Sequence, residues 1–121
     1  MPRTMWMAAG LALACSVESG GAWAQGTHQL SGVASYYGDN YKGAVASGPR
    51  YDPKKMTAAH RTLPFGTRLR VTDSKTHRSV DVVVNDRGPF IEGRVLDLSL
   101  AAATEMHMIE RGLINVTATV Q

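Results

Sequence analysis

Residues 79–90, Ser-Val-Asp-Val-Val-Val-Asn-Asp-Arg-Gly-Pro-Phe, constrain the fold of this chain more than any other stretch. β-Branched residues favour a strand, and a Gly-Pro pair favours a rigid turn directly after it. Every second residue from Val80 to Val84 lies on one face of such a strand, and Asp86 continues that face. The sequence therefore predicts a carboxylate at the rim of an apolar face, which is a candidate general acid. The alternative is a solvated turn in which Asp86 only caps backbone amides.

The N-terminal residues have the pattern of a secretory signal peptide. Arg3 precedes a short apolar segment over residues 5–15, and Ala22-Trp23-Ala24 is a small-x-small cleavage motif. We therefore expect a signal peptide over residues 1–24 and export to the periplasm. The alternative is a protein anchored to lipid through Cys15, the only cysteine of the chain.

Without its signal peptide, the chain is expected to form one small domain that has no disulfide. Its roughly one hundred residues must be stabilised by a packed core. Loss of Arg3 and Glu18 with the signal leaves the formal net charge at +3. This mild charge suits an anionic wall polymer but lacks the dense basic patches of proteins that bind nucleic acid. We expect no nucleic-acid partner, no transmembrane span after signal removal, and a monomer.

The remaining sequence consists mostly of short segments that alternate between apolar and other residues, as strands do. Strands are predicted over residues 31–37, 67–72, 78–85, 95–98 and 114–120, with a short apolar segment over 56–60 and a short leader over 25–30. Residues 38–52 are a long loop rich in glycine, and such loops often carry a binding or active site. Ser99 is expected to cap a helix that runs to about Arg111, with Gly112 just beyond its end. A small closed β-barrel would bury these strands without leaving an open edge.

Several kinds of chemistry have no matching motif in this sequence. The four histidines lack metal-ligand spacing, and no thiol remains once the signal has been removed. The sequence contains no G-x-S-x-G elbow and no glycine-rich loop that would cradle a phosphate. We therefore expect neither a metal nor a cofactor. Carboxylate chemistry remains, and Asp86 is the carboxylate that a rigid turn places best.

Six motifs in consecutive order resemble the RlpA-like (rare lipoprotein A) family. They are Gly32–Gly38, Ala46–Asp52, Thr57–His60, Leu63–Thr67, Asn85–Phe90 and Arg94–Ser99. The resemblance implies a mainly β fold over residues 31–121, namely a six-stranded double-psi β-barrel with one short α-helix, as in barwin and expansins. It also implies an endolytic lytic transglycosylase of the periplasm, which cleaves peptidoglycan glycan strands between N-acetylmuramic acid and N-acetylglucosamine and leaves a 1,6-anhydro product. The glycan-binding SPOR domain common in the family has no counterpart before Gln121, and we expect the protein to lack it.

Residue by residue, the resemblance makes Asp86 the catalytic acid/base, and His60 matches the histidine of the family's Thr-Ala-Ala-His segment. The residues expected to bind substrate are His60, Arg87, Tyr37, Tyr51 and Ser47. The alternatives are structural. His60 could be bonded to backbone, Arg87 could pair with Asp86 or Asp97, and the tyrosines could pack at the barrel rim.

One position departs from the family. Pro49 stands where the family usually has a glutamate that is considered part of its active site, and proline cannot transfer a proton. A lytic transglycosylase can nevertheless work with one acid/base, because the N-acetyl group of the substrate can stabilise the cation. The alternative function is a non-catalytic module that binds or loosens peptidoglycan. Pro49 favours that alternative, whereas the intact Asn85–Phe90 motif favours the enzyme.

Overall fold

The computed structural model of the protein describes residues 29–38 and 41–121. The elements of this part are β2 (Gln29–Tyr36), β3 (Thr57–Ala59), β4 (Arg68–Asp73), β5 (Ser79–Asp86), β6 (Arg94–Leu98), α3 (Leu100–Glu105) and β7 (Ile114–Val120). The predicted signal peptide and leader residues 25–28 lie outside the described residues. Within the described part, no helix has the length and apolar character needed to cross a membrane.

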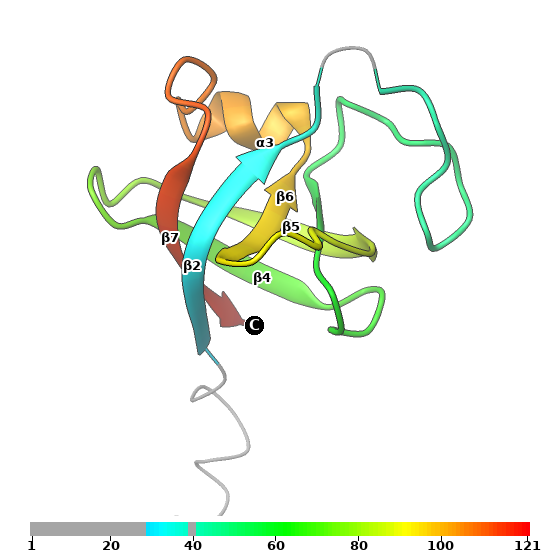
Figure 1. Ribbon diagram of the computed structural model, residues 1–121, viewed down its shortest axis with the longest axis horizontal. Helices are drawn as coiled ribbons and strands as arrows, with labels where there is room; N and C mark the ends of the chain where they lie inside the picture. Colours follow the sequence, from blue (N-terminus) through cyan, green and yellow to red (C-terminus); the bar gives the residue numbers. More distant parts are fainter. Residues whose placement is uncertain (1–28, 39–40) are drawn as a thin grey trace, which may run out of the picture.

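The strands close into a barrel in the order β2-β6-β3-β5-β4-β7 (Figure 1). The pairs β2–β6 and β3–β5 run parallel, and the other four pairs run antiparallel. The predicted barrel with one short helix is therefore confirmed. The bounds of β7 agree with the prediction, and those of the other predicted strands differ by one or two residues. The largest difference is at β2, which begins at Gln29, inside the segment that we expected to be a leader.

The core of the barrel is formed by the alternating residues that the sequence pattern indicated. In the β4–β5 hairpin, Val71 lies opposite Val80 and Leu69 lies opposite Val82, and all four side chains are buried. Burial of one such side chain contributes about 1.5–3 kcal/mol, so this apolar face fixes the register of the hairpin. The same alternation carries Asp86 to the end of β5, at the rim of the buried face.

The helix is shorter than predicted. Ser99 caps α3 as expected, but the helix ends at Glu105, well before Arg111. His107 adopts a left-handed conformation with φ 56°, which turns the chain so that Met108 is fully buried. The prediction that Gly112 follows the end of the helix is therefore wrong. In Figure 1, α3 lies at the end of the barrel where β2 and β6 finish.

Candidate functional site

Asp86 is the last residue of β5, and its carboxylate accepts three hydrogen bonds. Its Oδ1 accepts from the backbone N–H groups of Ala46, at 2.7 Å, and Arg87, at 2.9 Å. Its Oδ2 accepts from the phenol of Tyr37. The three donors belong to the long loop, to the turn after β5 and to the residue that follows β2. The half-buried carboxylate is thus held at the barrel rim by segments that are distant in sequence.

Three tyrosines form a packed cluster beside this carboxylate. The rings of Tyr37 and Tyr51 are stacked, with centroids 4.5 Å apart, and Tyr41 meets them edge-on at 5.3 and 5.5 Å. Tyr51 is buried, and its hydroxyl accepts a hydrogen bond of 2.9 Å from the N–H of Leu100. Tyr41 is 41% exposed, so it presents the most accessible ring of the cluster. Tyr41 is one of the four tyrosines near the long loop that could stack on sugar rings, but it lies between two of the motifs and was not in the set of residues expected to bind substrate.

The neighbouring tyrosine, Tyr36, belongs to the other side of β2. Its hydroxyl donates to the carbonyl of Ile109, at 2.7 Å, as expected from the alternation of side chains along a strand.

Burial raises the pKa of Tyr37, and the hydrogen bond to Asp86 and the charges of Asp86 and Asp97 raise it further. Tyr37 therefore keeps its proton throughout the physiological range. Burial also raises the pKa of Tyr51.

His60 follows β3 and is held by its own turn. Its backbone N–H donates to the carbonyl of Asp86, at 3.2 Å. Its Nδ1 accepts from the N–H groups of Thr62 and Leu63, at 3.1 and 3.0 Å. Because Nδ1 acts as an acceptor, the proton of a neutral ring lies on Nε2. The structural alternative proposed for this residue, a bond to backbone, is thus present, and substrate binding by His60 stays a prediction.

Arg87 does not pair with Asp86 through its side chain. Its Nη1 donates to the carbonyls of His60, at 3.2 Å, and Leu63, at 2.8 Å. Its Cζ lies 4.0 Å from the ring centre of Phe65, a cation–π distance. The guanidinium therefore ties the turn after β5 to the turn after β3. A direct contact of Arg87 with substrate stays a prediction.

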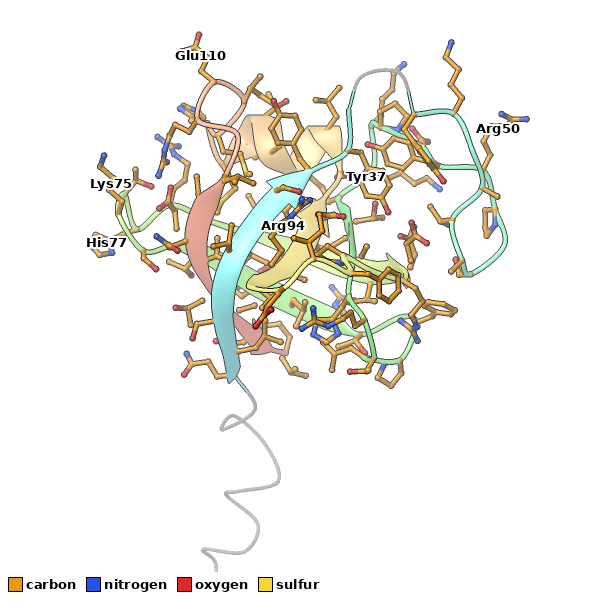
Figure 2. The ribbon with its side chains drawn as sticks, in the orientation of Figure 1. Tyr37, Arg50, Lys75, His77, Arg94 and Glu110 are labelled. Carbon is orange, nitrogen blue, oxygen red and sulfur yellow. The ribbon has the colours of Figure 1, made fainter. Side chains whose placement is uncertain are left out.

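The pairing of Arg87 with Asp97 that we considered is also not found. The cation bound to Asp97 is Arg94, whose Nη2 lies 2.8 Å from Oδ1, and Ser35 donates to the same oxygen at 2.6 Å. This polar group joins the parallel strands β2 and β6 (Figure 2 labels Arg94). The sequence gave no sign of it, because Ser35 and Asp97 come together only through that strand pairing. Among the described residues, no group of three or more His, Cys, Asp or Glu could hold a metal ion.

Ser47 and Pro49 lie on a tight loop that contacts β5 through its backbone. The N–H of Val45 donates to the carbonyl of Pro49 at 2.8 Å, which closes the loop. The N–H of Ser47 donates to the carbonyl of Asn85 at 3.1 Å, directly beside the Ala46 bond to the carboxylate. Pro49 is exposed at the tip. Position 49 is therefore three residues along the chain from Ala46, whose N–H donates to the Asp86 carboxylate.

Comparison with known proteins places the chain in a family. Residues 29–118 match the family described as "Lytic transglycolase". A protein from Nostoc sp. named probable endolytic peptidoglycan transglycosylase RlpA is 53% identical over 90 residues, which cover 72% of this chain and 24% of that protein. The endolytic peptidoglycan transglycosylase RlpA of Vibrio cholerae is 47% identical over 87 residues, which cover 71% and 33%. The chain thus matches about a quarter to a third of the length of these curated relatives.

Solved structures agree with this assignment. An expansin from Clavibacter michiganensis has a TM-score of 0.61 at 25% identity, over 78% of this chain and 50% of that one. The Streptomyces papain inhibitor has a TM-score of 0.60 at 25% identity, over 78% and 96%. The expansin-like double-psi β-barrel predicted from the sequence is therefore confirmed. With its fold, its ordered motifs and its relatives in agreement, the chain belongs to the RlpA-like family of double-psi β-barrel lytic transglycosylases.

Proposed function

We propose that this barrel is an endolytic lytic transglycosylase that acts on peptidoglycan glycan strands, with Asp86 as its acid and then its base. One observation carries the proposal. The Asp86 carboxylate lies at the barrel rim, where two backbone N–H groups and a phenol fix both of its oxygens. Among the described residues, Asp86 has no ion-pair partner. A carboxyl group oriented by neutral partners is suited to a reaction in which it gives up and recovers one proton.

The reaction needs only that one group and the substrate. The protonated carboxyl of Asp86 gives its proton to the glycosidic oxygen, the bond from that oxygen to C1 of the muramic acid breaks, and the glucosamine leaves with a hydroxyl. The N-acetyl oxygen of the muramic acid stabilises the positive charge at C1. The carboxylate then takes the proton of the C6 hydroxyl, whose oxygen bonds to C1 and closes the 1,6-anhydro ring. Asp86 ends protonated, as it began, and no water is consumed.

Mass spectrometry of products from glycan strands stripped of stem peptides tests this function. We expect anhydro-ended fragments from the wild type and their loss in Asp86→Asn, a reduction of at least the roughly 10²–10⁴-fold that a general acid contributes. The asparagine oxygen can still accept from Ala46 and Arg87, so the fold should be retained. Asp81→Asn is the matched control, because Asp81 lies on the same strand with an exposed side chain paired to Arg70. Wild-type product yield from Asp86→Asn would show that another group supplies the proton.

The second candidate is a module that binds peptidoglycan without cleaving it, and Pro49 is the observation that favours it. Pro49→Glu would place a carboxylate on the loop that already holds Asp86. The bond that closes the loop uses the carbonyl of residue 49, so the substitution can keep it. If the protein is a weakened enzyme, product release should rise by at most about 10²–10⁴-fold, and by less if the loop depends on the fixed φ of proline. Tight glycan binding without product from either protein would leave the binding module as the function.

Export to the periplasm is part of the proposal and rests on Arg3, the apolar segment and the Ala-Trp-Ala motif. We expect the mature protein to begin at Gln25. N-terminal sequencing of the protein recovered from the periplasm checks this. An acylated Cys15 at the N-terminus would instead show a lipid anchor.

A further inference from the structure

The two oxygens of the Asp86 carboxylate have partners of different kinds. The partners of Oδ1 are the backbone N–H groups of Ala46 and Arg87, which can only donate. The partner of Oδ2 is the hydroxyl of Tyr37, which can donate or accept by rotating about its C–O bond. A proton on Oδ1 would meet two donor hydrogens and cost both hydrogen bonds. A proton on Oδ2 requires only that one hydroxyl turn.

We propose that Oδ2 is the oxygen that carries the catalytic proton, and that Tyr37 is a positioning residue whose hydroxyl reverses as Asp86 loses and regains that proton. This inference rests on the proposed function. In the acid form, Oδ2–H donates to the Tyr37 oxygen until the glycosidic oxygen takes the proton. As the proton leaves, the phenol turns and donates to Oδ2, where negative charge develops. Tyr37 keeps its own proton in both states, so the proton count of the reaction is unchanged.

Packing holds Tyr37 in place for this role. Its ring is stacked on Tyr51, whose hydroxyl is tied to the N–H of Leu100 at the start of α3. Its backbone N–H donates to the carbonyl of Leu98 at 3.0 Å. Figure 2 shows Tyr37 directly beyond the end of β2, beside the long loop. The ring is therefore fixed, and only its hydroxyl hydrogen needs to move. Burial also raises the pKa of Tyr37, so the phenol stays protonated and its hydroxyl can donate or accept.

Other ionisable groups lie near the pair. They are Tyr41 and Tyr51 from the long loop, His60 after β3, Arg87 after β5 and Asp97 on β6. The Asp97 carboxylate is bound by Arg94, and the Arg87 guanidinium is bound to two carbonyls. Tyr37 is the described side chain whose hydroxyl donates to the carboxylate of Asp86.

Tyr37→Phe, compared with Tyr36→Phe, tests the inference on the active enzyme. Loss of a hydrogen bond to a charged group costs about 1.5–3 kcal/mol, so we expect kcat to fall by about 10–100-fold in Tyr37→Phe while KM changes little. The limb of the pH–rate profile that reports Asp86 should move to higher pH, because the carboxylate has lost a donor. Tyr36→Phe should change neither kcat nor the profile, since its hydroxyl contacts Ile109. A raised KM with unchanged kcat in Tyr37→Phe would show that Tyr37 contacts the sugar and would overturn the inference.

A second measurement does not depend on turnover. The side-chain carboxyl of Asp86 can be titrated by carbon-13 NMR in the wild type, in Tyr37→Phe and in Tyr36→Phe. We expect the midpoint to move to higher pH only in Tyr37→Phe. A shifted midpoint in a protein that releases no product would retain the hydrogen-bond assignment and reject the enzymatic function. An unshifted midpoint would overturn the assignment whatever the activity.

Discussion

Asp73 and Asp86 are the last residues of β4 and β5, so they lie at opposite ends of the same hairpin. Asp73 is fully buried, its Oδ2 lies 2.5 Å from Nη1 of Arg111, and its Oδ1 accepts from the N–H of Lys75 at 2.8 Å. Asp86 is half-buried, and its partners are a phenol and two backbone groups. In Figure 2, Lys75 in the hairpin turn and Tyr37 beside Asp86 lie on opposite sides of the barrel.

The partners of Asp73 hold it in a structural ion pair, whereas the partners of Asp86 leave its carboxyl able to act as an acid or a base. Burial by itself raises the pKa of Asp73, but the hydrogen bond and charge of Arg111 and the N–H of Lys75 outweigh it and lower the pKa to about 2. Asp73 is therefore a permanent anion at neutral pH, and it anchors the loop that carries Arg111. Asp86 has neutral partners, and one of them can donate or accept. Residue type and strand position are the same at the two sites, so the difference comes from the neighbours.

The largest effect on stability should come from Arg111→Met, which leaves the Asp73 carboxylate buried without its cation. Loss of one partner of a fully buried pair costs about 3–5 kcal/mol. Because Arg111 is 33% exposed, we expect a smaller loss of about 2–3 kcal/mol in the free energy of unfolding. Urea unfolding measures it, and activity per folded molecule should stay within twofold of wild type. Arg70→Met, at an exposed pair on the same hairpin, is the control and should show no comparable loss.

The second prediction concerns the stability of the folded chain at acid pH. The pKa of Asp73 is lower in the folded chain than its ordinary value of 3.8. Its contribution is therefore complete above about pH 4 and is lost as the pH falls toward 2. A difference of nearly two pKa units corresponds to about 2 kcal/mol. Urea midpoints measured from pH 6 to pH 2 should show this loss in the wild type but not in Asp73→Asn. Parallel curves for the two proteins would contradict the assignment.

Arg87 tests the comparison at the other end of the hairpin, because it is the arginine beside Asp86. Its guanidinium holds the carbonyls of His60 and Leu63, so Arg87→Met should lower stability by about 1–2 kcal/mol. The pH–rate profile of the folded enzyme should keep its midpoints. Arg87→Lys should recover only part of the stability, since lysine lacks the planar group that lies over the ring of Phe65. A displaced profile would mean that Arg87 acts on the carboxylate after all.

The smallest effect should come from Ser47→Ala. The Asp73 carboxylate is held by the side chain of Arg111 together with one backbone N–H. The long loop, in contrast, holds the Asp86 carboxylate only through the backbone N–H of Ala46. Removal of the Ser47 hydroxyl should therefore change the unfolding free energy by less than about 0.5 kcal/mol. Ser47→Pro is the informative contrast, because it removes the N–H that donates to Asn85. Weakened binding in the alanine variant would support the predicted contact of Ser47 with substrate.

The sequence pattern predicted those structural features that depend on residues close together in the chain. The alternation from Val80 to Val84 fixed the strand and the rim position of Asp86, and Ser99 marked the start of the helix. The end of the helix could not be predicted, because nothing in the apolar pattern shows that His107 takes a positive φ. Two of the three partners of Asp86 could not be predicted either. Tyr37 and Ala46 lie 49 and 40 positions away in sequence and meet it only in the closed barrel.

The place of β7 in the sheet has a consequence for how the chain reaches its native state. This strand pairs with β2 on one side and β4 on the other, so Gln29 lies opposite Thr119. The barrel can therefore close only after residue 120 has been synthesised, and contacts between such distant segments make folding slow. Until then, β2 and β4 each present an unpaired edge that can join a strand of another chain. Synthesis interrupted before Ile114 would thus yield an aggregation-prone chain in which β2 and β4 both present open edges.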